Sequence, residues 1–244
     1  MKRNSLLIAT LFVTLIAGAQ SINLHMNNGV VVNYNSSEVD YIDFSENSSS
    51  PVSYTSCPDG NHPHLIDLGL PSGTKWACCN VGAEKPVDYG GYFAWGETAE
   101  KSSYTSDNYL DGKGTSYNIG KDIAGTQYDA ATANWGSPWV MPSKEQMDEL
   151  VNNCTSEWTT ENGVKGRRFT ASNGASIFLP AAGDRWYDDL YYAGSYGDYW
   201  SSTLYESDTS RAWYLDFYSG LVSTNYYDYY YRYYGQSVRP VRKN

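Results

Sequence analysis

Tyrosine is the residue type that stands out most in this sequence, by number and by position. Of 24 tyrosines in 244 residues, 15 lie in the segment 187–234. A tyrosine side chain offers a large contact area, a hydroxyl group for hydrogen bonding and only two torsions to immobilise when a ligand binds. The segment is therefore predicted to form a displayed binding surface, which contacts a protein or stacks on the rings of a glycan.

Residues 213–218 indicate how such a surface is built on a strand. Their sequence, WYLDFY, alternates with a period of two, as in a strand with one packed face. We expect Trp213, Leu215 and Phe217 to be packed and the residues between them to face outward. The run 225–234, NYYDYYYRYY, has no apolar periodicity, which favours ligand contact over packing. The candidate ligand-binding residues are Tyr205, Ser207, Tyr214, Asp216, Tyr218, Asn225, Tyr226, Tyr227, Asp228, Tyr229, Tyr230, Tyr231, Tyr233 and Tyr234.

A structural role is the alternative interpretation for part of this cluster. Tyrosine is common in strands, and Tyr187, Tyr192 and Tyr199 fit core or turn positions. Arg239, which precedes a proline, is expected to satisfy buried carbonyl groups or acids rather than a ligand. Five tryptophans are expected in the core: Trp76, Trp95, Trp139, Trp200 and Trp213.

The residue patterns of enzymes and of metal sites are missing from the sequence. It has no GxSxG nucleophile motif and no phosphate-binding loop. His62 and His64 are expected to be solvated, and the spacing of Asp184, Asp188 and Asp189 fits no calcium loop. We therefore predict that the protein is not an enzyme and needs neither a cofactor nor a metal ion.

The N-terminal residues predict an exported protein. Lys2 and Arg3 precede an apolar stretch, and the small residues at 17–19 predict a signal peptide over 1–19. Cleavage removes two of the 17 basic residues and none of the 27 acidic ones, so the formal charge changes from −10 to −12. A protein with this negative charge is repelled by phosphate groups, so we expect it not to bind nucleic acid. No segment is long and apolar enough to predict a membrane span, so we expect a secreted or cell-surface (outer-membrane-associated) location.

The rest of the chain divides by composition. Residues 20–44 alternate apolar and polar side chains around Asn28-Gly29, which predicts a small β-hairpin unit with a third strand near 39–44. The serine-rich residues 45–56 are predicted to form a linker, and 57–244 the main domain.

The main domain is predicted to be α+β, with short strands, long loops and one or two helices. Ser143 and Gln146 form a capping-box pattern that predicts a helix start, followed by apolar residues at helical spacing. A second helix is expected over 121–134, although Gly125 weakens it.

Four cysteines add a further constraint on this domain. They are Cys57, Cys78, Cys79 and Cys154, and an even number in an exported protein favours disulfides over a zinc site. Adjacent cysteines rarely bond to each other, so each needs a partner elsewhere. Spacing alone leaves the connectivity open.

Five sequence blocks, in this order, resemble one known family. They are residues 65–83 (LIDLGLPSGTKWACCNVGA), 90–98 (GGYFAWGET), 139–154 (WVMPSKEQMDELVNNC), 199–203 (YWSST) and 235–242 (GQSVRPVR). Together they resemble the Fibrobacter succinogenes major paralogous domain, a C-type-lectin-like module of bacterial surface proteins. The resemblance implies a C-type-lectin-like fold and a Cys79–Cys154 disulfide, with Cys57–Cys78 as a second pair.

Some members of this lectin-like group are the variable proteins of diversity-generating retroelements. In those systems adenine-directed mutation turns Asn codons into codons for Tyr, Asp and Ser. Residues 203–234 contain these residue types and no Lys, Gln or Met, which fits that process. The resemblance therefore implies an adhesin or receptor-like protein with a diversified binding face. The alternative is an invariant structural or glycan-binding module of the cell envelope.

Overall fold

The computed structural model describes residues 21–25, 31–35, 64–224 and 230–242, and the chain divides into two compact units, 1–51 and 52–244. In the first unit, β1 (Ser21–His25) pairs antiparallel with β2 (Val31–Asn35), as the sequence predicted. The signal peptide, the Asn28-Gly29 turn, the third strand near 39–44 and the linker 45–56 lie outside the described residues.

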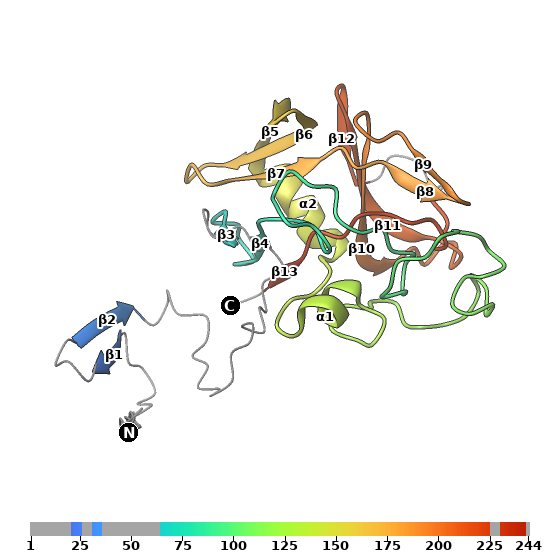
Figure 1. The fold of residues 1–244 in the computed structure, drawn as a ribbon, viewed down its shortest axis with the longest axis horizontal. Coiled ribbons are helices and arrows are strands. Elements are labelled where there is room, and N and C mark those ends of the chain that lie inside the picture. Colours follow the sequence, from blue (N-terminus) through green and yellow to red (C-terminus); the bar gives the residue numbers. More distant parts are fainter. Residues whose placement is uncertain (1–20, 26–30, 36–63, 225–229, 243–244) are drawn as a thin grey trace, which may run out of the picture. The chain divides into compact units, whose positions relative to one another are not determined.

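The second unit consists of small antiparallel sheets and two helices, so the predicted α+β class is confirmed (Figure 1). One sheet has the order β5-β6-β7 and another has the order β10-β11-β12. The bounds are β5 (Cys154–Glu161), β6 (Val164–Ala171), β7 (Ser176–Pro180), β10 (Gly197–Leu204), β11 (Ala212–Tyr218) and β12 (Leu221–Ser223).

A third sheet joins the two ends of the main domain. Its order is β13-β4-β3, so that strands near residue 70 pair with a strand at the C-terminus. The bounds are β3 (Leu65–Asp67), β4 (Lys75–Ala77) and β13 (Val241–Arg242). A separate two-stranded ladder joins β8 (Asp184–Trp186) to β9 (Asp189–Tyr191).

Helix α2 (Lys144–Asn153) begins where the sequence predicted. The hydroxyl of Ser143 accepts a hydrogen bond from the backbone N–H of Gln146, and the Gln146 side chain accepts one from the Ser143 N–H. Met147 and Leu150 are buried on the face that packs against β10 and β11. No helix in the described residues is both long and apolar enough to cross a membrane.

Helix α1 (Ala130–Trp135) is much shorter than the helix predicted over 121–134. The carboxylate of Asp129 caps it by accepting hydrogen bonds from the N–H groups of Ala131 and Thr132. The same carboxylate accepts the N–H of Gly125, which lies at φ +72°. The chain before Asp129 is therefore held in turns that end on this side chain.

Two hydrophobic clusters form the core, and the β10–β11 ladder contributes to both. Trp200 of β10 and Tyr214 of β11 belong to the first core cluster, together with Trp95 and Trp139. The alternate residues of these strands belong to the second core cluster: Tyr199, Leu215 and Phe217. Of the five tryptophans predicted to lie in the core, four are fully buried. Trp213, also predicted to be packed, is only half-buried.

Arg239 has the role predicted for it. Its side chain is fully buried and donates hydrogen bonds to the backbone carbonyls of Ala77, Cys78 and Phe178 and to Oδ1 of Asn80. It thereby connects the strand β4 region to the end of the chain.

The cysteine prediction needs a correction, because the Cys79–Cys154 disulfide is not formed. Cys154 carries a free thiol, and burial raises its pKa. It packs against the second core cluster, whereas the buried Cys79 belongs to the first and places its Sγ 3.9 Å from the carbonyl oxygen of Ala83. Cys57 lies outside the described residues, so the Cys57–Cys78 pair stays a prediction.

Candidate functional site

Exposed aromatic side chains gather on the β8–β9 ladder and the turn that follows it. Trp186 pairs with Asp189, which leaves the two-residue turn 187–188 between the strands. Four of the five large hydrophobic side chains that are exposed among the described residues lie here: Trp186 (38 %), Tyr187 (54 %), Leu190 (40 %) and Tyr192 (59 %). A gathering of exposed hydrophobic side chains of this kind indicates a contact surface.

Two of these exposed tyrosines have an unfavourable backbone conformation. Tyr187 lies at φ +51° and Tyr192 at φ +58°, in the left-handed region that non-glycine residues seldom occupy. Tyr187 is held there by a pair of backbone hydrogen bonds with Tyr104, at 2.9 and 3.0 Å. The carbonyl oxygen of Tyr192 accepts the N–H groups of Ser195 and Tyr196. The fold therefore keeps two strained residues whose rings are mostly in solvent.

The C-terminal tyrosines extend this surface in one direction. The Trp186 ring stacks on Tyr234, with centroids 5.9 Å apart and planes 6° apart. Tyr233 lies 5.1 Å from Tyr234 and stacks on Tyr231 at 5.4 Å, and Tyr230 lies edge-on to Tyr234 at 5.3 Å. Segments about 45 residues apart in the sequence thus share one array of rings.

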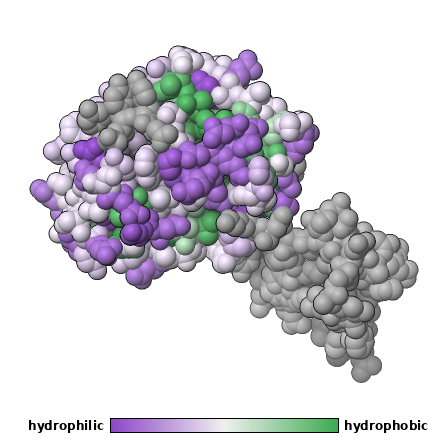
Figure 2. All heavy atoms as spheres, turned by 180° about the vertical axis from the view of Figure 1, so that it is seen from behind, coloured by the Kyte–Doolittle hydropathy of each residue, from purple (hydrophilic) through white to green (hydrophobic). Residues whose placement is uncertain are grey.

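On the other side the array continues toward β11. Tyr191 contacts Tyr192, Tyr192 contacts Tyr196, and Tyr196 lies 5.2 Å from Tyr218. We call these ten residues the aromatic surface: Trp186, Tyr187, Tyr191, Tyr192, Tyr196, Tyr218, Tyr230, Tyr231, Tyr233 and Tyr234. Figure 2 shows the face of the molecule opposite to Figure 1, where hydrophobic residues form only small patches among hydrophilic and near-neutral ones.

Arg232 anchors the tyrosine segment 230–234 to the body of the domain. Its side chain is 1 % exposed and donates hydrogen bonds to the backbone carbonyls of Thr115, Tyr117 and Thr209 at 2.7–3.2 Å. The guanidinium group also lies over two aromatic rings. The segment is therefore fixed by one arginine between its tyrosines.

The residues under this segment require a correction of the predicted site. Tyr214 and Asp216 were expected to face outward, but they are only 6 % and 5 % exposed. The ring of Tyr230 covers Tyr214 in an edge-on contact at 4.9 Å, and Trp200 lies on the other side of Tyr214 at 6.2 Å. The alternation of β11 is as predicted, but both of its faces are covered. Tyr214 and Asp216 are thus floor residues beneath the aromatic surface.

Three carboxyl groups are buried in this floor. Asp198 is directly opposite Asp216 in the β10–β11 ladder, and Asp184 accepts a 3.5 Å hydrogen bond from the Tyr230 hydroxyl. Burial raises the pKa of Asp184 and of Asp216 to about 7. Burial, with the neighbouring Asp184 and Asp216, raises the pKa of Asp198 well above its ordinary range. The floor is therefore protonated in part at neutral pH.

The other predicted ligand-binding residues are distributed as follows. Tyr218 is half-buried within the aromatic surface. Tyr205 instead packs edge-on against Trp213 at 5.0 Å, and Ser207 is exposed on the loop that follows. Neither makes a ring contact with the aromatic surface among the described residues. Five further candidates lie outside the described residues: Asn225, Tyr226, Tyr227, Asp228 and Tyr229.

The list of candidate ligand-binding residues omitted the part of the surface formed by β8, β9 and the following turn, although the segment 187–234 as a whole was predicted to be a displayed surface. Tyr187 and Tyr192 were interpreted as core or turn residues, and Trp186 was not a candidate. The signal was present in residues 186–192, WYDDLYY, where four of seven side chains are aromatic. Strands of three residues are too short to show a period of two.

In residues 64–224 and 230–242, no group of three or more His, Cys, Asp or Glu side chains is placed to hold a metal ion. The three floor aspartates therefore do not form such a group. The aromatic surface itself presents rings and phenol hydroxyls, which act through stacking and hydrogen bonding.

Sequence comparison identifies one related family. The profile of a family described as a domain of unknown function (DUF8237) matches residues 149–241, from within α2 to β13. The match includes every residue of the aromatic surface. Comparisons with curated proteins and with solved structures find no match.

Proposed function

We propose that this chain is an exported ligand-binding protein, adhesin-like or receptor-like, and that the aromatic surface is its binding site. The observation that carries this proposal is the left-handed backbone at Tyr187 and Tyr192. Such strain costs about 1–3 kcal/mol per residue, and rings that are more than half exposed return little of it through burial. Strain that packing does not require is typical of functional positions.

The chemistry of the surface fits a protein or glycan ligand. Trp186, Tyr187 and Tyr192 present exposed rings with few torsions to immobilise, as in antibody binding loops. Tyr233 and Tyr234 are half-buried, so their rings are already oriented before a ligand arrives. The formal charge of −10 argues against nucleic acid as the ligand.

We further propose that the domain is C-type-lectin-like and that its C-terminal face is diversified. The sequence resemblance supports the fold, and the restricted residue types of 203–234 support the diversification. Under this proposal, variation is expected at residues of the surface and not at the buried residues beneath it. Tyr218, Tyr231 and Tyr233 belong to the surface, whereas Tyr214 and Arg232 are buried contacts of its support.

Binding of cell-surface proteins and a glycan array, measured with wild type and three variants, tests the assignment. Trp186→Ala, Tyr187→Gly and Tyr192→Gly should each weaken binding by about tenfold or more, as for central aromatic contacts. Asp107→Ala is the control, because Asp107 is exposed and lies outside the aromatic surface. Equal binding by all four variants and wild type would exclude the aromatic surface as the site.

The second candidate function is an invariant envelope module in which the tyrosines serve the fold or stack on a fixed sugar. It is favoured by the buried positions of Tyr214 and Asp216, which the diversification hypothesis did not expect. The 3′ end of the gene, compared between sibling strains, distinguishes the two. Differences concentrated at the codons of Tyr218, Tyr231 and Tyr233 support diversification, and their absence there excludes it.

A further inference from the structure

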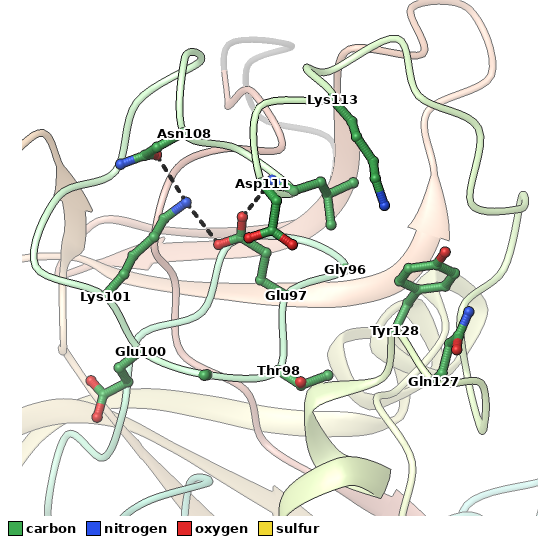
Figure 3. A pocket seen from close by; sticks show the side chains of 12 residues that line it. Gly96, Glu97, Thr98, Glu100, Lys101, Asn108, Asp111, Lys113, Gln127 and Tyr128 are labelled. Carbon is green, nitrogen blue, oxygen red and sulfur yellow. Dashed lines mark hydrogen bonds and ion pairs between the residues drawn. The ribbon is translucent and has the colours of Figure 1, made fainter.

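A separate pocket lies among loops that do not belong to the aromatic surface. Its volume is about 520 Å³, within the range of small-ligand sites. Three segments line it: residues 96–101, residues 108–113 and the pair Gln127 and Tyr128 that precedes helix α1 (Figure 3). None of these residues falls in the matched family segment 149–241.

One wall of this pocket is fixed by a neutral ion pair. Oε2 of Glu97 lies 2.7 Å from Nζ of Lys101, and Lys101 also donates a hydrogen bond to Oδ1 of Asn108 at 3.1 Å. The side chains of Glu97 and Lys101 are only 14 % and 20 % exposed. Since the two charges neutralise each other, this wall gives no strong preference for an ionic ligand.

The adjoining loop at Leu110 and Asp111 is held in a strained conformation. Leu110 and Asp111 lie at φ +48° and +56°, and Gly112 follows at +80°. Oε1 of Glu97 accepts the Leu110 N–H at 2.6 Å, and the Leu110 side chain is buried. Two consecutive left-handed residues other than glycine are costly, and strain of this kind clusters at ligand sites. The exposed side chain of Asp111 lines the pocket, as does Lys113 two residues further along the same loop (Figure 3).

The polar groups at the mouth retain their capacity to bind. Within the described residues, Asp111 and Gln127 make no hydrogen bond through their side chains, and Lys113 contacts only the ring of Tyr117. Asp111 is an acceptor, Lys113 a donor, and Gln127 both. Tyr128 adds an aromatic ring on the same side as Gln127 (Figure 3).

We propose that this pocket binds a single sugar unit, a neutral pyranose. Each sugar hydroxyl donates and accepts, so hydroxyls at different positions around the ring can bond to Asp111, Lys113 and Gln127, while the apolar face of the ring packs on Tyr128. Asp111 repels a simple anion and Lys113 repels a simple cation, so neither kind of ligand is favoured. The pocket is a second site, independent of the aromatic surface.

Saturation-transfer NMR on the full chain tests this proposal. The probes are the methyl pyranosides of glucose, galactose, mannose and N-acetylglucosamine, with glycine and alanine as zwitterionic comparators. At least one pyranoside should give a saturable signal. Asp111→Gly should weaken it by about fivefold or more; glycine tolerates the left-handed backbone, so the loop is preserved. Gln127→Ala should weaken it to a similar extent.

Two controls make the outcome decisive. Asp107→Ala changes an exposed carboxylate on the same loop but outside the pocket, and it should leave the signal unchanged. Trp186→Ala should also leave it unchanged, which separates this site from the aromatic surface. The proposal is overturned by a lack of saturable pyranoside binding, by binding that Asp111→Gly and Gln127→Ala do not weaken, or by saturable binding of the amino acids alone.

Discussion

The two faces of the β10–β11 ladder differ in what they contribute. One face carries Leu215 and Phe217, both fully buried in the second core cluster against Phe169 and α2. The other face carries Asp198 and Asp216, and three of their buried carboxyl oxygens have no hydrogen-bond partner among the residues that the structure describes. The first face is conventional apolar packing. The second buries polar groups, which costs free energy when they lack partners.

The two faces of the ladder therefore have different roles. The apolar face stabilises the fold, and the acidic face supports a layer of aromatic rings whose own backbone is strained at Tyr187 and Tyr192. Functional surfaces are commonly maintained at the expense of stability. Truncating an apolar side chain of the first face should therefore lower the free energy of unfolding, whereas replacing a buried carboxyl group of the second face by a neutral amide should raise it.

The largest expected effect is on the apolar face. Phe217→Ala should lower the free energy of unfolding by about 3–5 kcal/mol, because the ring is fully buried and fills the space over Gly197. Tyr218→Ala, one residue further along, should lower it by only about 1–2 kcal/mol, because that ring is half-buried. Urea denaturation measures both. Equal losses would show that the apolar face contributes no more to the free energy of unfolding than the face that carries Tyr218.

A smaller effect, opposite in sign, is expected from the acidic face. Asp184 and Asp216 have a pKa of about 7 in the folded chain and an ordinary value of 3.8. Between these values the folded state binds more protons than the unfolded chain. Their contribution to stability is therefore complete below about pH 4 and is lost as pH rises through about 7, at up to about 1.4 kcal/mol per pH unit for each group.

Asp216→Asn tests this directly, because the amide stays neutral at every pH. The variant should be more stable than wild type at pH 7.5 by about 2–4 kcal/mol and should lose less stability between pH 5 and pH 7.5. Asp107→Asn, at an exposed position, should follow the wild-type curve. Parallel wild-type and Asp216→Asn curves would mean that Asp216 is ionised throughout. Urea denaturation at several pH values supplies the measurement.

Local features of the fold were predictable from sequence, and features that depend on distant segments were not. The start of α2 was predicted because the Ser143 and Gln146 side chains act within one turn. The alternation of β11 was predicted because a period of two is visible in six consecutive residues of the sequence. The cover over the second face of β11, the one with Tyr214 and Asp216, was not predicted. Tyr230 provides it, and Tyr230 is fixed through Arg232 to carbonyls more than 100 residues away in the sequence.

The same distinction applies to the candidate site. The tyrosines at 230–234 were named as candidates from their composition and their lack of apolar periodicity. The exposed hairpin residues were not named individually, because Tyr187 is held by Tyr104, a contact that no local sequence pattern predicts. The Cys79–Cys154 pairing came from resemblance and is wrong here, since the two cysteines lie in different core clusters.

The smallest effect concerns the strained tyrosines, where a substitution should raise stability and weaken binding at the same time. Tyr192→Gly should raise the free energy of unfolding by about 0.5–1 kcal/mol, because glycine adopts φ +58° without strain and the ring is 59 % exposed. Tyr117→Gly is the matched control at an ordinary φ, and it should lower stability by about the same amount. Thermal denaturation compares the two, and ligand binding by Tyr192→Gly should fall at the same time. If both glycines destabilise the protein equally, Tyr192 is not strained, and the argument that its ring is held in place for binding fails with it.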